Sequence, residues 1–449
     1  MTTPVITNPE QEVNELKTII ASALQQAKSL GASAAEVGVS AESGLSVTAR
    51  LGQVETVVFN RDKNFGITVY KGKSKGSAST SDSSPAAIAS AVKAACDIAQ
   101  FTEADQYAGL ADDADLAKNI INLDLYHPWA LSPQAAIELA IDCESKARAY
   151  DKRITNSEGA SVEAYQGRHA YGNTNGFLEG YSSTRHSISC MLVAGSGDGM
   201  VGDYWYTTAR DTKDLESTEI VGKKAAERCI AHLNARRIAT CKAPVLFAAD
   251  IAGSLISTFN AAIRGSSLYR KASFLVDSIG KPIFPNFVRI YENPLLAKGL
   301  GSACYDSEGV ATNSSDIVTE GILQRYLLSS YAARRLGLKT TGNAGGVHNL
   351  FITPGEKNFA ALLKEMDRGL VITELMGQGI NLVTGNYSRG ASGFWVEQGE
   401  IKFPVHEITI AGNLRDMFAQ IVAVGNDVDR RGNVITGSIL IENMTIAGT

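Results

Sequence analysis

The sequence lacks most of the patterns by which membrane proteins and nucleic-acid-binding proteins are identified. Its 449 residues contain no apolar run near the roughly 20 residues that a membrane helix needs. The net charge is −5 and the pI is about 5.8, so no basic surface for nucleic acid or an anionic membrane is expected. The first residues, MTTPVITNPEQEV, show no basic segment followed by an apolar one, and we therefore do not expect export.

Paired cysteines are also missing. The six cysteines are scattered along the chain and form no CxxC pair. This spacing favours neither a disulfide framework nor a zinc ribbon. We therefore expect free thiols and a cytoplasmic protein.

The familiar catalytic motifs are absent as well. There is no GxxxxGK[ST] phosphate loop, no glycine fingerprint opening a helix and no GxSxG elbow. His406 and Glu407 begin like the HExxH zinc motif, which needs a second histidine one helical turn later. Ile410 and Ala411 stand in that place, and the run 405–410 alternates as a strand does. We do not expect a metal at His406.

Two isolated residues could carry chemistry. Cys304, in GSACYDSEG, could be a thiol nucleophile, although no histidine lies near it in sequence and a partner close in space stays open. His348 follows two glycines in TGNAGGVHN. A loop histidine of this kind either hydrogen-bonds to the backbone or faces a ligand.

What is present is a repeated order of helices and strands over the first half of the chain. Helices are predicted at 11–30, 85–101, 133–150 and about 215–233 from apolar residues at helical spacing and from Ser-Pro starts. Short strands are predicted at 35–39, 44–49, 54–60, 66–70, 161–170, 177–193 and 200–208. The acidic, weakly patterned segment 102–127 is interpreted as a linker.

After residue 236 the sequence becomes rich in glycine and in strands. A strand at 244–249 leads to a helix that we expect Asp250 to cap. Short helices are predicted near 329–336, 359–366 and 414–423, and a closing strand pair at 434–441 and 444–447. The fold class is therefore α+β, with an N-terminal α+β domain at 1–115, a middle α+β region at 116–237 and a mostly β, barrel-like C-terminal domain at 238–449.

The stretch 373–400 is the most unusual part of this domain. Strands at 369–375 and 380–383 precede a predicted interruption at 386–393, and the glycines at 377, 379, 390 and 393 lie beside Tyr387 and Arg389. Glycine allows positive φ and close backbone approach. The stretch is either a tight barrel corner or a surface shaped for a ligand.

Several segments resemble the PmbA (TldE) half of the TldD/PmbA metalloprotease family. They are NRDKNFGITVYKGKSKGSAS, GNTNGFLEGYSSTRHSIS, GSSLYRKASFLVDSIGK, YDSEGV, TELMGQGIN, NYSRGASGFWVEQGEI and EITIAGNLRDMF. The resemblance implies a cytosolic heterodimer with a TldD-type protease subunit. Such a heterodimer degrades or trims unfolded peptides, including antibacterial peptide precursors and an antitoxin.

The resemblance also implies where the metal is held. The TldD half carries HExxxH on the helix after the first strand of its C-terminal domain, and a cysteine ligand near its C-terminus. Ala252, Gly253 and Ser257 stand at the HExxxH positions here, and no cysteine follows Cys304. We therefore expect no zinc in this chain and a catalytic zinc in the TldD-type partner.

Three hypotheses follow for the function. The first is a subunit without its own catalytic zinc that shapes the peptide chamber of the heterodimer, with homodimers possible when the chain is isolated. The chamber candidates are Gln378, Tyr387, Ser388, Arg389 and His348. The second is a self-sufficient hydrolase using Cys304 or a serine, and the third is a peptide-binding or regulatory module without enzymatic activity.

Overall fold

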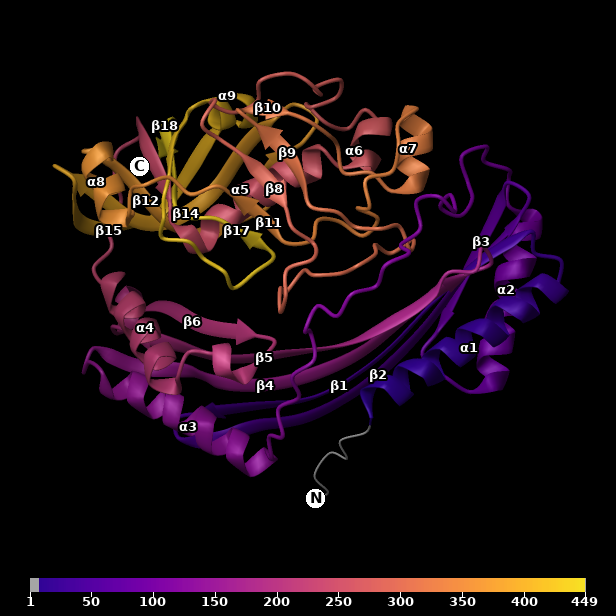
Figure 1. Cartoon of the computed structure of the whole chain (residues 1–449). Coiled ribbons are helices and arrows are strands. Elements are labelled where there is room, and N and C mark those ends of the chain that lie inside the picture. Colours follow the sequence, from indigo (N-terminus) through magenta and orange to yellow (C-terminus); the bar gives the residue numbers. More distant parts are fainter. Residues whose placement is uncertain (1–7, 449) are drawn as a thin grey trace.

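The computed structural model of the protein describes residues 8–448, without the side chain of Asp198. A long, curved sheet spans the molecule, with helices on its outer face and the C-terminal domain above its concave face (Figure 1). The chain is therefore α+β, as the sequence predicts, and its C-terminal domain is barrel-like. No helix within residues 8–448 has the length and apolar character needed to cross a membrane.

The curved sheet has six strands, in the order β3-β2-β1-β4-β5-β6. Their bounds are β1 Ala34–Arg50, β2 Gln53–Lys71, β3 Ser74–Thr80, β4 Ile154–Asn173, β5 Leu178–Ala194 and β6 Val201–Ala209. The prediction of four short strands before residue 71 is wrong, because β1 and β2 each run without a break. Residues that fall between the predicted strands, such as Ser43 and Arg61, face each other across the ladder.

The two predicted helix-and-strand units share this one sheet. β1 pairs with β4 from Glu36 opposite Asn173 to Ala49 opposite Ala160. This long antiparallel contact joins the residues on either side of the segment 102–127. Residues 34–80 and 154–209 therefore form one continuous sheet, and we call this sheet with the helices that cover it the sheet region.

Four helices cover the outer face of the sheet region. They are α1 Pro9–Ser29, α2 Pro85–Phe101, α3 Pro133–Ala149 and α4 Thr218–Ala231. Each helix begins at an N-cap residue whose side chain accepts a hydrogen bond from a backbone N–H of the first turn. The N-cap residues are Asn8, Ser84, Ser132 and Ser217. α1 and α2 pack on one end of the sheet and α3 and α4 on the other, each pair over its own apolar core.

The predicted linker is irregular, yet it is not loose. Leu110, Leu116, Leu123 and Leu125 are buried. The N–H of Ala117 donates to the carbonyl of Gly309 at 2.9 Å. The segment 102–127 therefore runs between the sheet region and the C-terminal domain and helps to join them (Figure 1).

The C-terminal domain contains a closed ring of strands. β7 Cys241–Phe247, β12 Gly369–Met376, β14 Asn386–Glu397, β15 Glu400–Asn413 and β18 Ile439–Ala447 pair in the order β12-β7-β18-β15-β14, and β14 pairs back with β12. β13 Ile380–Asn381 and β16 Ile421–Val424 attach to this ring. Closing the sheet leaves these strands no free edge along most of the ring.

A second sheet and short helices complete this domain. The sheet has the order β10-β9-β8-β11-β17, with β8 Ile290–Glu292, β9 Ser315–Thr319, β10 Ile322–Leu323, β11 Leu350–Ile352 and β17 Val434–Ile435. The helices are α5 Ala249–Ala262, α6 Gly265–Tyr269, α7 Ser330–Leu336, α8 Phe359–Met366 and α9 Leu414–Ala419. The core between them is rich in phenylalanine: Phe247, Phe259, Phe274, Phe284 and Phe418 are all buried.

Three local predictions in this domain are wrong. Residues 386–393 are part of β14 and do not interrupt it, because Gly393 lets the carbonyl of Val371 approach within 1.9 Å of where a Cβ would lie. The predicted closing pair is mainly one strand, β18, and it pairs with β7 and β15. The N-cap of α5 is Ala248, and Asp250 instead bonds to Arg228.

Candidate functional site

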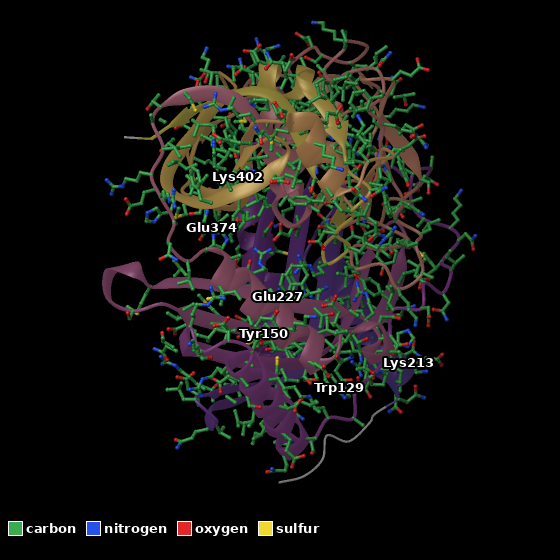
Figure 2. All side chains as sticks on the ribbon, turned by 90° about the vertical axis from the view of Figure 1, so that its left-hand side faces the viewer. Trp129, Tyr150, Lys213, Glu227, Glu374 and Lys402 are labelled. Carbon is green, nitrogen blue, oxygen red and sulfur yellow. The ribbon has the colours of Figure 1, made fainter. Side chains whose placement is uncertain are left out.

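A cavity of about 670 Å³ lies where the sheet region meets the C-terminal domain. Strand β6 and helix α4 form one wall, and α5, β12, β14 and β15 form the other. Figure 2 shows Glu374, one of the lining residues, on the side of the C-terminal domain that faces the sheet region. The site is therefore assembled from residues far apart in sequence.

An ionic cluster joins the two walls. Arg228 of α4 contacts Asp203 of β6 at 3.3 Å and donates to Asp250 of α5 at 2.8 Å. His232 lies 3.5 Å from Asp203 and 3.2 Å from the hydroxyl of Thr373, and burial lowers its pKa. Burial raises the pKa of Asp250, against the effect of the neighbouring arginines. The cluster fixes the relative position of α4, β6 and α5.

Arg431 makes the second link between the walls. Its guanidinium lies 3.6 Å from the ring centre of Trp205 and 4.5 Å from that of Tyr206, both on β6. Asp429 pairs with the same guanidinium at 2.7 Å. A planar guanidinium stacks well on aromatic faces. This residue places the loop before β17 against the sheet region.

The C-terminal wall presents Glu374, Arg389, Ser392 and His406 to the cavity. Arg389 donates to the carbonyls of Gly377 at 3.1 Å and Leu375 at 3.4 Å. These bonds hold the guanidinium at the cavity wall. Although Glu374 lines the same cavity, the guanidinium of Arg389 bonds to these carbonyls and to no carboxylate among residues 8–448.

Opposite charges nearly balance in this cavity. The carboxylates of Asp203, Asp250 and Glu374 face the guanidinium groups of Arg228, Arg389 and Arg431. Most of these groups already have partners of opposite charge or carbonyl partners. A balanced, polar lining with aromatic walls suits the main chain of a peptide better than a strongly charged ligand.

The residues at the cavity do not fit a zinc ion. The cavity face of α5 carries Asp250, Ile251 and Ser254. Of the residues at the HExxxH positions, Ala252 is fully buried, Gly253 has no side chain and Ser257 donates to the carbonyl of Gly253. Among residues 8–448, no three His, Cys, Asp or Glu side chains come together as a metal site would require.

The predicted chamber residues are found in different surroundings. Arg389 lines the cavity, whereas Gln378 and Ser388 are exposed and are not among its lining residues. Tyr387 is 2% exposed within the core of the C-terminal domain, and burial raises its pKa to about 12. The ring of His348 lies 3.1 Å from the carbonyl of Gly342 and 3.3 Å from that of Gly301. His348 thus contacts the backbone of its own loop at Gly342 and of a second loop at Gly301.

Cys304 is poorly placed to act as a nucleophile. It is 8% exposed, and its thiol donates to the carbonyl of Ile121 at 3.4 Å. Burial raises the pKa of this thiol, which disfavours the reactive thiolate. The structure therefore gives no support to the hypothesis of a hydrolase that uses Cys304.

Most of the cavity residues were missed by sequence reasoning. Asp203, Arg228, His232 and Arg431 lie in ordinary strand, helix and loop patterns with no motif around them. His406 was considered only as a metal ligand, and it lines the cavity from β15. Only the pairing of distant elements brings these side chains together.

Three family models match successive parts of the chain. The model described as PmbA/TldA metallopeptidase domain 1 matches residues 35–99, the central domain matches residues 126–233 and the C-terminal domain matches residues 240–448. The central and C-terminal models meet at residues 233–240, where the chain passes beside the cavity. Together the three models cover most of the chain.

Individual proteins are similar over nearly the whole length. The chain is 51% identical to the Metalloprotease PmbA of Escherichia coli O157:H7, over 99% of this chain and 98% of that protein. A crystal structure of a candidate modulator of DNA gyrase from Bacteroides thetaiotaomicron superposes with a TM-score of 0.91 at 27% identity, over 97% of this chain and 99% of that one. TldE from Thermococcus kodakarensis shares the fold, with a TM-score of 0.84 at 21% identity over 95% and 99% of the two chains.

Proposed function

The chain belongs to the PmbA/TldA metallopeptidase family, and we propose that it is the subunit of a two-chain zinc protease that binds peptide without holding the zinc. A TldD-type partner chain supplies the metal and the general base in this proposal. The substrates are unfolded peptides, such as peptide precursors that are trimmed and an antitoxin that is degraded. Relatives of the chain include proteins named Metalloprotease TldD homolog.

The observation that carries the proposal is the composition of α5. This helix follows the first strand of the C-terminal domain and borders the cavity, yet its only ionisable side chain is Asp250. Asp250 is already paired with Arg228 at 2.8 Å. A hydrolytic zinc is held by about three protein ligands and binds a water at its open coordination position. Helix α5 offers no histidine or cysteine for this purpose, so the metal is assigned to another chain.

What the chain contributes in this proposal is a polar wall for an extended peptide. Arg389 has five N–H donors, and the two carbonyls that hold it leave others for the carbonyls of a bound peptide. Tyr204, which is 53% exposed, offers aromatic surface on the opposite wall. Main-chain bonding of this kind tolerates many sequences, as a protease for unfolded peptides requires.

A reducing, cytoplasmic location is part of the proposal. All six cysteines are free thiols, and five of them are buried. Proteins of oxidising compartments usually pair such residues when they lie close enough. The location is tested by fractionation of cells that produce the chain.

Metal and activity measurements test the proposal. The chain and a TldD-type partner are purified separately without added metal and analysed for zinc, and then each is assayed alone and together on an unfolded peptide. We expect no stoichiometric zinc in this chain, no cleavage by it alone and chelator-sensitive cleavage by the pair. About one zinc per chain with cleavage by the isolated chain would falsify the proposal. Failure of the two chains to associate at micromolar concentration would equally reject the partnership.

A further inference from the structure

Ser392 of β14 lies between two strands that each carry a β-bulge at its level. On β12, Glu374 stands opposite Ser392, and Thr373 is the extra residue of the bulge. On β15, the register with β14 shifts at the same level, so that His406 and Glu407 share the place opposite Ser392. All of these residues except Glu407 line the cavity. β-Bulges are common next to functional sites, where they redirect a side chain.

The bulge on β15 is strained and is held by the segment between α4 and β7. Glu407 has a φ of 52°, which is unfavourable for a residue with a Cβ. The carbonyl of Arg236 accepts from the N–H of His406 at 3.4 Å, and the N–H of Arg236 donates to the carbonyl of Pro404 at 2.9 Å. Glu407 pairs with Arg237 away from the cavity lining. The bulge therefore leaves His406 as the residue that β15 presents to the cavity at this level.

Three side chains form a short polar row across β12, β14 and β15. Residues opposite each other in antiparallel strands have their Cβ atoms about 5 Å apart. Glu374, Ser392 and His406 are therefore neighbours on the cavity wall, and we call them the acceptor row. None of the three side chains has a hydrogen bond or an ion pair among residues 8–448. The acceptor row is therefore free to bond to a ligand.

Within residues 8–448, Glu374 is a cavity carboxylate without a cationic partner. Asp203 and Asp250, the other carboxylates of the lining, both contact Arg228. The charge of Glu374 also acts on His232, but His232 lies against Asp203. Glu374 is exposed, so a ligand can reach it from solvent. A single positive group therefore suits this part of an otherwise balanced lining.

We propose that the acceptor row binds an ammonium group of the peptide substrate. An ammonium group has three N–H donors, and a carboxylate, a hydroxyl and a neutral imidazole can each accept one of them. Arg389 bonds to the carbonyls of Leu375 and Gly377, which follow Glu374 in the chain. The carbonyls and the ammonium group of one peptide can therefore bind next to each other. The inference rests on the proposed function, because the ammonium group belongs to the bound peptide.

Two groups of a peptide carry this chemistry, the amine at its N-terminus and the side chain of lysine. Four versions of one unstructured peptide separate them: with both groups, with an acetylated N-terminus, with lysine replaced by glutamine, and with both changes. Each peptide carries a fluorophore at its C-terminus. Fluorescence anisotropy measures binding to the full chain alone, and to the chain with a TldD-type partner in excess chelator, where no cleavage is expected.

The wild type should distinguish the charged peptide from the neutral one. Removal of both ammonium groups should weaken binding at least about tenfold, since hydrogen bonds between charged groups are the stronger ones. The single change that reproduces this loss identifies the source of the ammonium group. Equal affinity for all four peptides would overturn the proposal.

Variants of the acceptor row assign the effect to its residues. Glu374→Gln keeps the shape but removes the charge, so it should weaken binding of the charged peptide about fivefold and leave the neutral peptide unaffected. Ser392→Ala and His406→Ala each remove one acceptor and should weaken binding of the charged peptide about threefold. The melting temperatures should stay near that of the wild type, because these side chains have no partner within the described residues.

Glu442→Gln is the matched control. Glu442 lies on β18, is exposed, has no side-chain partner among residues 8–448 and does not line the cavity, so both affinities should stay unchanged. A Glu374→Gln variant that binds the charged peptide as the wild type does, or that loses affinity equally for both peptides, would also overturn the proposal.

These outcomes are distinguishable from failure of the proposed function. Peptide binding that ignores charge would reject only the ammonium site, since zinc content, partnership and cleavage are measured separately. Binding of none of the four peptides, by the chain alone or with its partner, would reject both the ammonium site and the peptide-binding role.

Discussion

The sheet region and the C-terminal domain are stabilised in different ways. Under α3 and α4 the sheet region packs small side chains, mostly alanine, valine and cysteine, and its long strands carry the structure through paired backbone. The C-terminal domain is built around buried aromatic rings, with Phe259 in contact with both Phe284 and Phe418. A shallow core leaves the sheet dependent on its ladders and its neighbours. The C-terminal domain instead buries large side chains in a deep core beside the cavity wall.

The largest difference in the free energy of unfolding should appear when a buried side chain is truncated in each core. Phe259→Ala removes a fully buried ring and should lower the free energy of unfolding by about 3–5 kcal/mol. Val162→Ala, at a fully buried position of the sheet region, removes two methyl groups and should cost about 2 kcal/mol. Urea titrations followed by fluorescence and circular dichroism give both values.

An exposed ring serves as the control for this contrast. Phe287 is 50% exposed, and Phe287→Ala should change stability by less than about 0.5 kcal/mol. Equal losses from Phe259→Ala and Val162→Ala would mean that the two cores contribute alike, and the distinction drawn between them would fail.

The next largest loss of stability should come from the contact between the two regions. Arg431→Ala removes the guanidinium that is stacked on Trp205 and Tyr206, and leaves Asp429 without its partner. A partly desolvated cation–π contact is worth about 2 kcal/mol, and we expect a loss of that size. Differential scanning calorimetry should show whether the two regions then unfold in separate transitions.

The matched variant is Arg431→Lys. It keeps the positive charge but loses the planar, two-sided contact, so its stability should fall between those of the wild type and Arg431→Ala. A lysine variant as stable as the wild type would show that charge alone joins the regions.

Features that depend on short stretches of sequence could be predicted. Amphipathic helices such as α2, with Ser84 and Pro85 at its start, follow local rules and were predicted to within a few residues. The family was recognised from whole segments, and the family matches confirm it. The structure likewise confirms the α+β fold class. This class could be predicted because helix spacing and strand alternation are local signals.

The cavity could not be predicted, because its lining depends on pairings between distant elements. Asp203 and Asp250 meet Arg228 only once β6, α4 and α5 are packed together. The continuity of β1 and β2 was missed for a related reason. Polar residues in 41–44 and 61–64 signal turns when read locally, and the ladder between the two strands overrides that signal.

Peptide turnover should respond to the cavity wall while the stability does not. Arg389→Ala removes the donors at the wall without opening a core, since its bonds go to two backbone carbonyls. If the proposed function holds, turnover by the reconstituted pair should fall about tenfold, or about 1.4 kcal/mol. The melting temperature should stay near that of the wild type.

Arg289→Ala is the control for this experiment. Arg289 pairs with Asp316 on the surface of the C-terminal domain and is not among the cavity-lining residues, so turnover should not change. A loss of turnover by Arg389→Ala that tracks a loss of stability would leave this arginine with a structural role only.

The smallest effect concerns the shorter of two ion pairs that Lys298 makes between the two regions. Asp211, just after β6, accepts from Nζ of Lys298 in the C-terminal domain at 2.7 Å. This bond, helped by the backbone N–H of Lys213, lowers the pKa of Asp211 to about 2. A carboxylate whose pKa is lowered by folding stabilises the folded state above its ordinary value near 3.9, and this contribution is lost as the pH falls towards 2. Asp211→Asn should therefore lower the melting temperature at pH 7, and the difference from the wild type should narrow below about pH 5.

Asp316→Asn removes an ion pair that lies wholly within the C-terminal domain, and it should leave the docking of the two regions intact. A difference for Asp211→Asn that stays constant from pH 7 to pH 3 would mean that this contact between the regions depends on shape and not on charge.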